Sequence, residues 1–271
     1  MIVFPDAKIN IGLRITERRS DGYHNIETVF YPVKLYDALE FVPGNKSEDS
    51  LTETGFVTGA AGTDNLVIKA AMKLREVRNY PFLKIHLHKG IPSGAGLGGG
   101  SSDAACLLKA VNRNFSLGVP ENQLKTISLQ LGSDCPFFIE NTPSFATGRG
   151  EILQPAGNFL SGNYLVLLNP GVHISTREAY SSCKPEKPTD SLSDLIKKPV
   201  AEWKDSVVND FEEFAVAKHP VIGQLKKALY DCGALFALMS GSGSSVFGIF
   251  GSMPEIPEQL KKYVIFEGEM R

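Results

Sequence analysis

The sequence has few cysteines, no long apolar run and almost no net charge. Its four cysteines, spread over 271 residues, form no C-x-x-C pair, which argues against a zinc ribbon and a dithiol redox site. No uninterrupted apolar run approaches the ~20 residues that a membrane helix needs. No basic segment precedes the apolar residues at the amino terminus, so we expect no signal peptide. These absences predict a soluble, cytoplasmic protein that does not bind a membrane.

The charge balance argues against another class of partner. The chain carries 28 basic and 30 acidic side chains, with a formal net charge of -2 and a pI near 6.2. Such a chain has no overall field that would attract a phosphate backbone, so we expect no nucleic-acid partner. The length suits one large domain or two smaller ones.

The chain has 26 glycines, and several of them form a cluster between a segment with a strand pattern and a segment with a helix pattern. Residues 82–89 alternate between apolar and polar side chains, which predicts a half-buried strand. Residues 94–100 include five glycines, and residues 101–111 are good helix formers. Either Ser101 or Ser102 is a suitable cap for this helix.

Further elements follow from apolar patterns, glycines and prolines. Helices are predicted at 64–71, 120–131 and 220–233, strands at 164–169, 234–239 and 246–250, and an exposed connection at 184–199. Several glycines and a proline between residues 148 and 162 indicate a boundary, and we divide the chain into domains 1–155 and 156–271.

A glycine-dense turn that enters a helix can bind phosphate, because it exposes backbone N–H groups at the positive end of the helix dipole. The P-loop pattern fails, since no lysine follows these glycines. The protein-kinase pattern fails, since Ser101 replaces its valine and neither H-R-D nor D-F-G occurs. The dinucleotide pattern fits Gly94, Gly96 and Gly99, but no convincing second strand with a ribose-binding acid follows. It stays open as an alternative, as does a glycine turn without a ligand.

Four segments carry a resemblance to one family. Residues 92–105 (PSGAGLGGGSSDAA) resemble the phosphate-binding motif of the GHMP small-molecule kinases. Residues 7–28, 132–138 and 239–247 are similar to other segments of that family and follow in the same order. The resemblance implies an α+β, two-lobed fold, with an amino-terminal lobe like domain 2 of ribosomal protein S5 and a ferredoxin-like carboxy-terminal lobe.

The resemblance also implies an activity. The G-L-G-G-G-S-S form of the motif is similar to the branch that uses ATP to phosphorylate the 2-hydroxyl of a cytidine diphosphate ester of methylerythritol, in the non-mevalonate isoprenoid route. Alternatives are a GHMP kinase for a sugar, homoserine or mevalonate, and a nucleotide-binding protein without catalysis. We expect a monomer or a homodimer.

Two residues receive catalytic roles from the resemblance. Asp134 would orient the attacking hydroxyl and accept its proton late, since an aspartate is too weak a base to remove that proton before attack. Lys8 would keep Asp134 ionised and stabilise charge on the moving phosphoryl group. The structural alternatives are a helix-capping aspartate and a solvated lysine.

The resemblance implies that ATP binds to the glycine segment and its flanking residues, and also to Asn65, which lies earlier in the sequence. The predicted ATP-binding residues are Asn65, Pro92, Ser93, Gly94, Ala95, Gly96, Leu97, Gly98, Gly99, Gly100, Ser101 and Ser102. Mg²⁺ is implied by the chemistry of phosphoryl transfer, while no cluster of metal ligands is evident in the sequence.

The substrate end is assigned in the same way. The predicted substrate-binding residues are Asn10, Tyr23, His24, Asp134, Thr176, Tyr180, Gly241 and Ser242. Tyr23 and His24 suit a cytosine, because a tyrosine ring can stack on a base and an imidazole can hydrogen-bond its edge. The alternatives are a core aromatic for Tyr23 and a plain hairpin turn for the Gly241 loop.

Overall fold

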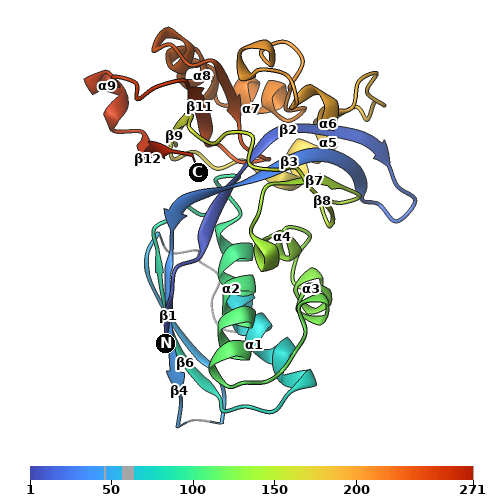
Figure 1. Cartoon of the computed structure of the whole chain (residues 1–271), viewed down its shortest axis with the longest axis vertical. Coiled ribbons are helices and arrows are strands. Elements are labelled where there is room, and N and C mark those ends of the chain that lie inside the picture. The colour runs from blue at the N-terminus through green and yellow to red at the C-terminus, as the bar shows by residue number, and fades with distance from the viewer. Residues whose placement is uncertain (46, 57–63, 271) are drawn as a thin grey trace. The chain divides into compact units, whose positions relative to one another are not determined.

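The computed structural model describes residues 1–45, 47–56 and 64–270 (Figure 1). The chain divides into two compact units that are interleaved in sequence. Unit 1 comprises residues 1–8, 32–93 and 98–142, and unit 2 comprises residues 9–31, 94–97 and 143–271. The glycine segment therefore passes from unit 2 to unit 1 between Leu97 and Gly98.

Unit 1 contains a sheet with the strand order β1-β4-β6-β5. Its strands are β1 (Ile2–Val3), β4 (Ala38–Pro43), β5 (Ser50–Gly55) and β6 (Leu83–Lys89). Strand β6 pairs antiparallel with β4 and parallel with β5. Its buried and exposed residues alternate strictly, which confirms the predicted half-buried strand.

The described residues of unit 1 also form the helices α1 (Leu66–Val77), α2 (Gly99–Asn114), α3 (Glu121–Leu129) and α4 (Cys135–Glu140). Helix α1 packs on α2, and α4 packs on both α2 and α3, on one side of the sheet (Figure 1). Helix α2 buries alanine and leucine at helical spacing, including Ala104, Leu107, Leu108 and Val111, so removal of this apolar surface from water holds it in place.

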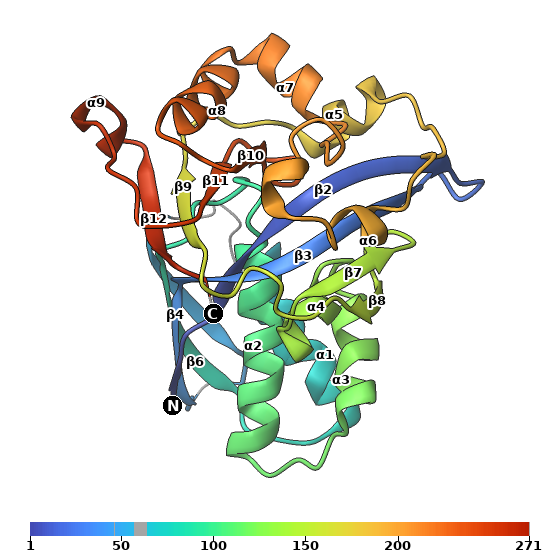
Figure 2. The same cartoon turned by 45° about the horizontal axis from the view of Figure 1, so that its top comes forward.

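Unit 2 contains an antiparallel sheet with the order β10-β11-β9-β12. Its strands are β9 (Tyr164–Leu168), β10 (Phe236–Met239), β11 (Val246–Phe250) and β12 (Val264–Glu269). Helix α8 (Val221–Asp231) packs on β10 and β11, and α7 (Glu212–Lys218) packs on α8 (Figure 2). Strands β9, β10 and β11 confirm three predicted strands, and α8 confirms the helix that follows Pro220.

The remaining sheet has the order β2-β3-β7-β8. Its strands are β2 (Asp6–Arg18), β3 (His24–Tyr36), β7 (Ser144–Thr147) and β8 (Ile152–Pro155). The long strands β2 and β3 each have residues in both units. The described parts of the chain also contain the short helices α5 (Thr176–Ser182), α6 (Leu192–Leu195) and α9 (Glu258–Lys261) and a 3-10 helix at Val200–Glu202.

Two local predictions need correction. Helix α2 begins at Gly99, with the left-handed Gly98 in the cap position, so Ser101 and Ser102 lie inside the helix and do not cap it. The segment 184–199 is not wholly exposed, because α6 buries Leu192 and Leu195. None of the helices in the described parts of the chain is long and apolar enough to cross a membrane.

Candidate active site

The second half of the glycine segment forms the amino-terminal end of α2. Gly98 has φ +71°, a backbone conformation that favours glycine, and as a glycine in the cap position it brings no side chain to cap the helix. The first N–H groups of α2 therefore face a place where an anion can accept their hydrogen bonds. A Cβ atom on Gly98 would lie 2.8 Å from the Phe138 ring and 3.1 Å from Lys8 Cε, so glycine is required for this close packing.

Lys8 and Asp134 meet in unit 1 beside this helix end. Lys8 Nζ lies 3.5 Å from Asp134 Oδ2, and the Lys8 side chain is 4% exposed while that of Asp134 is 35% exposed. Burial lowers the pKa of Lys8, and the charge of Asp134 and a hydrogen bond to it oppose that shift. The pair is thus a buried cation next to a carboxylate that a substrate can reach.

The structural alternatives for these two residues do not fit the geometry. Asp134 occupies the cap position of α4, but its side chain makes no capping hydrogen bond and instead contacts Lys8. Lys8 is buried and so is not a solvated lysine. Ser101 lies close by, because its hydroxyl hydrogen-bonds the thiol of Cys135, the residue after Asp134.

The first half of the glycine segment packs against the Gly241 loop within unit 2. Ser240 Oγ donates to Gly96 O at 2.9 Å, and Ser245 N donates to Ala95 O at 3.2 Å. A Cβ atom on Gly96 would lie 1.9 Å from Ser240 O, and Gly96 has φ +80°. The Gly241 loop joins the antiparallel strands β10 and β11, but these contacts make it more than a plain hairpin turn.

Asn10 lies at the base of these two loops. Its backbone N donates to Ser240 Oγ at 3.1 Å, and its side-chain Nδ2 donates to Thr28 Oγ1 at 2.9 Å. Thr28 Oγ1 in turn donates to Gly12 O at 2.6 Å. Asn10 is 2% exposed, so in this structure it supports the loop, and its contact with the substrate stays a prediction.

Sequence reasoning missed one residue that holds the Gly241 loop. Asn209 Nδ2 donates to the backbone oxygens of Met239 and Gly241, both at 2.8 Å. An isolated asparagine outside every motif gives no signal of this contact in the sequence. Thr28 lies within a motif but received no predicted role, although its hydroxyl links β2 and β3 beside Asn10.

The residues predicted for the cytosine end gather in unit 2. Tyr23 is 54% exposed, which contradicts the alternative of a core aromatic, and the guanidinium of Arg149 lies 4.8 Å from its ring centre. The His24 ring stacks on Tyr180 with 5.1 Å between ring centres. Burial lowers the pKa of His24, with a further contribution from the charge of Arg18, so the neutral imidazole is favoured. Thr176 Oγ1 and Ser242 Oγ are 2.9 Å apart.

The other predicted ATP-binding residues have different surroundings. Asn65 caps α1, with Oδ1 accepting from Val67 N at 2.9 Å and Nδ2 donating to Glu53 at 2.8 Å. Ser93 and Gly94 are exposed, whereas Ala95 and Leu97 are buried. Pro92, Gly99 and Gly100 are half-buried. The role of each in ATP binding stays a prediction.

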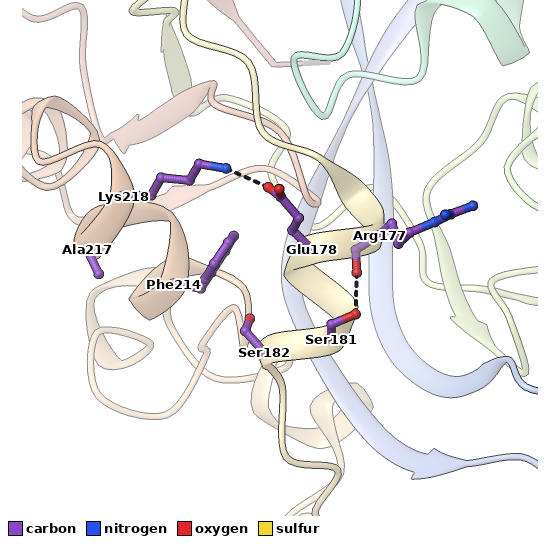
Figure 3. A pocket seen from close by; sticks show the side chains of 7 residues that line it. All are labelled: Arg177, Glu178, Ser181, Ser182, Phe214, Ala217 and Lys218. Carbon is purple, nitrogen blue, oxygen red and sulfur yellow. Dashed lines mark hydrogen bonds and ion pairs between the residues drawn. The ribbon is translucent and has the colours of Figure 1, made fainter.

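A separate hollow of about 560 Å³ lies between α5 and α7 in unit 2 (Figure 3). Its lining residues are Arg177, Glu178, Ser181, Ser182, Phe214, Ala217 and Lys218. Glu178 and Lys218 form an ion pair at 2.5 Å across it. The hollow is open and mostly apolar, and its lining includes no residue of the predicted site.

Comparisons with known proteins identify the family of the chain. The family model "GHMP kinases N terminal domain" matches residues 65–141, and "GHMP kinases C terminal" matches residues 191–265. The 4-diphosphocytidyl-2-C-methyl-D-erythritol kinase of Bacteroides thetaiotaomicron is 50% identical over 260 residues, which cover 94% of this chain and 95% of that protein. The chain belongs to the 4-diphosphocytidyl-2-C-methyl-D-erythritol kinase family of GHMP kinases. Both the resemblance and the α+β GHMP kinase fold predicted from the sequence are confirmed.

Solved structures agree with this family. A crystal structure of a 4-(cytidine 5'-diphospho)-2C-methyl-D-erythritol kinase has a TM-score of 0.77 and 32% identity, and the match covers 92% of this chain and 90% of that one. The mevalonate kinase of Methanococcus jannaschii has a TM-score of 0.64 at 12% identity, covering 97% of this chain and 92% of that one, which shows a shared fold alone. As GHMP kinases, members of this family use ATP as the phosphoryl donor and a small molecule as the acceptor.

Proposed function

We propose that this protein transfers the γ-phosphoryl group of ATP to the 2-hydroxyl of 4-diphosphocytidyl-2-C-methyl-D-erythritol. The observation that carries the proposal is the contact between Lys8 and Asp134 beside the glycine-rich start of α2. A nucleotide-binding protein without catalysis has no need of a buried cation held next to an accessible carboxylate. The full-length similarity to kinases of this name supports the choice of acceptor.

In the proposed reaction the substrate oxygen forms a bond to the γ-phosphorus as the bond from phosphorus to the bridging oxygen of ADP breaks. Asp134 accepts a hydrogen bond from the attacking hydroxyl and takes its proton as the new P–O bond forms. Lys8 keeps Asp134 ionised and stabilises negative charge on the transferring group. The backbone N–H groups at the start of α2 bind the phosphate oxygens of ATP.

Mg²⁺ is a further part of the proposal. No group of three histidine, cysteine or acidic side chains that could hold a metal occurs among the residues that the structure describes. Mg²⁺ commonly takes most of its ligands from substrate phosphates and water, with one or two from the protein. The hydroxyl of Ser101, on the first turn of α2, fits such a role better than that of Ser102, which is 2% exposed. When bound, the ion would neutralise charge on the phosphate oxygens.

The cytidine end of the substrate is assigned to unit 2. The half-exposed ring of Tyr23 can stack on the base. His24 stacks on Tyr180, and Thr176 hydrogen-bonds Ser242, so these two pairs offer further stacking and hydrogen-bonding groups. We place the protein in the cytoplasm, where ATP is available. Whether it acts as a monomer or a homodimer stays a prediction.

The test is an assay of ATP consumption with four acceptors. We expect ADP release with 4-diphosphocytidyl-2-C-methyl-D-erythritol, and phosphorus NMR of the product should show a phosphomonoester on the 2-oxygen. Mevalonate, homoserine and galactose serve as controls. Activity with one of these controls and none with the cytidine substrate would contradict the proposed acceptor, whereas no activity with any of them would contradict the catalytic proposal.

A further inference from the structure

Three buried charged side chains lie beneath the start of α2. Lys89 is the last residue of β6, Asp37 lies between β3 and β4, and Asp103 is in the first two turns of α2. Each is at most 2% exposed. Lys89 Nζ forms ion pairs with Asp37 and, at 2.6 Å, with Asp103. None of the three has a part in the mechanism proposed above.

Asp37, at one end of this cluster of three residues, binds the backbone that leads into the glycine segment. Asp37 Oδ1 accepts from Gly90 N at 2.7 Å and from Ile91 N at 2.8 Å. These are the two residues between β6 and Pro92. Asp37 therefore fixes the direction in which the chain leaves the strand, while its other oxygen binds Lys89.

Lys89 and Asp103, at the other end of the cluster, lie against the first two turns of α2, where the glycine segment ends. A Cβ atom on Gly99 would lie 3.1 Å from Lys89 Nζ, so the ammonium group sits directly against the first residue of α2. Asp103, one turn further along the helix, binds the same ammonium group. The three side chains thus connect the entrance of the glycine segment at Gly90 and Ile91 to its exit at Gly99.

Stability alone does not account for buried charges in this place. A buried ion pair or triad often contributes no more to stability than apolar side chains of similar volume. Here burial raises the pKa of Asp103 while the charge of Lys89 opposes that shift, and Asp103 Oδ1 has no hydrogen-bond partner among the described residues. Apolar packing leaves the exact geometry less constrained. The hydrogen bonds of an ionic group fix the distance and the angle between the elements that they join.

We propose that Lys89, Asp37 and Asp103 are positioning residues for ATP, which hold the two ends of the glycine segment at the separation that aims its backbone N–H groups at the phosphates. The inference rests on the proposed role of this segment in ATP binding. Displacing a binding group by about 1 Å costs up to ~100-fold in rate or affinity, so a rigid support here has a large effect.

The test compares Asp103→Leu with Asp103→Asn, two side chains of similar volume. Asparagine keeps an oxygen acceptor for Lys89, whereas leucine removes the connection to α2 and leaves Lys89 paired with Asp37. For Asp103→Leu we expect the Kd for ATP and the KM for ATP to rise about tenfold or more, at an unchanged KM for the cytidine substrate. Asp103→Asn should stay within about threefold of the wild type in both.

A matched control is available at the opposite end of β6. There Asp49 accepts two hydrogen bonds from Arg75, at 2.7 and 2.8 Å, and one from Leu83 N at 2.8 Å. Asp49→Leu should lower Tm and leave the KM for ATP unchanged, because this ion pair has the same kind of contacts in the same unit but does not touch the glycine segment. An equal rise in the KM for ATP in Asp49→Leu would contradict a positioning role.

The possible results separate the two proposals. If Asp103→Leu does not fold, Asp103→Ala takes its place, since alanine suits a helix and also lacks the acceptor. An unchanged Kd for ATP in the folded variant overturns the positioning role while the proposed function stands. A wild-type protein that does not bind ATP in calorimetry contradicts the proposed function itself.

Discussion

At the scale of single residues, Lys8 is a buried lysine whose side chain lies next to the carboxylate of Asp134. Removing the ammonium group from water favours its neutral form, and the neighbouring carboxylate of Asp134 opposes this. A buried charge often contributes no more to stability than apolar side chains do, so the position of this pair beside the start of α2 is consistent with the functional use proposed for it. The roles proposed for Lys8 and Asp134 can be tested separately.

Asp134→Asn tests the proton acceptor. The amide keeps the size of the side chain and a hydrogen-bond acceptor for the hydroxyl, but it cannot take the proton. We expect kcat to fall about 10²- to 10⁴-fold while the Kd for ATP changes little. Steady-state kinetics and calorimetry measure the two quantities.

The matched control for that variant is Asp231→Asn. Asp231 also pairs with a lysine, Lys227, at 2.6 Å, but on the exposed surface of α8. The variant Asp231→Asn should leave kcat unchanged. Near-normal turnover in Asp134→Asn would remove this aspartate from the proposed mechanism.

The pH dependence of kcat tests Lys8. Burial favours the neutral form, so the pKa of Lys8 in the folded protein lies below the ordinary 10.5, and any positive charge on Lys8 is lost as the pH rises through this lowered pKa. We expect kcat to decline on the alkaline side with an apparent pKa below 10.5. A kcat that stays constant up to that pH would show that the charge of Lys8 is not needed.

At the scale of elements, the regular patterns were predictable and the ends of the elements were not. The alternation in 82–89 identified β6 because one face of that strand is buried. The predicted start of α2 is wrong, since capping preferences favoured Ser101 or Ser102. Gly98 takes the cap position because its left-handed backbone turns the chain into the helix and lets Lys8 pack against it.

Gly96→Ala tests the contact between the two glycine loops. The new Cβ atom would lie 1.9 Å from Ser240 O, in a backbone conformation that alanine rarely adopts. We expect the free energy of unfolding to fall by about 2–4 kcal/mol and the KM for ATP to rise. Thermal or denaturant unfolding and steady-state kinetics measure these effects.

Gly157→Ala separates the steric effect from the conformational one. Gly157 also has a positive φ of +74°, but a Cβ atom on it would meet no described residue within 4 Å apart from its chain neighbours. This variant should cost about 1 kcal/mol in unfolding free energy, from backbone conformation alone. Equal losses in the two alanine variants would mean that the contact with Ser240 is unimportant for stability.

At the scale of the whole molecule, a protein with a net charge of -2 has to bind two anionic ligands. The structure offers local groups for this purpose: the start of α2, the buried Lys8 and the backbone of the glycine segment. Interactions inside a partly buried site are screened by salt much less than a long-range field. Ionic strength is therefore a test of how the ligands are attracted.

We expect the KM for ATP to change less than about threefold between about 50 and about 300 mM KCl at saturating Mg²⁺. Steady-state kinetics at constant pH measure this dependence. A much steeper rise of KM with salt would indicate a long-range basic surface that attracts ATP, contrary to the local binding proposed.

The sequence by itself determined the family, through its motifs, and the strand, glycine turn and helix around the segment that is predicted to bind phosphate. These features can be predicted from short stretches of sequence, because apolar periodicity and a run of glycines both involve residues that are close together in the chain. The tertiary structure decided which distant residues meet. Lys8 and Asp134 are 126 positions apart, and Asn209 holds a loop 30 positions away. Only the folded chain joins Asp37, Lys89 and Asp103, because hydrogen bonds between distant segments depend on how strands and helices pack, and no local pattern encodes that packing.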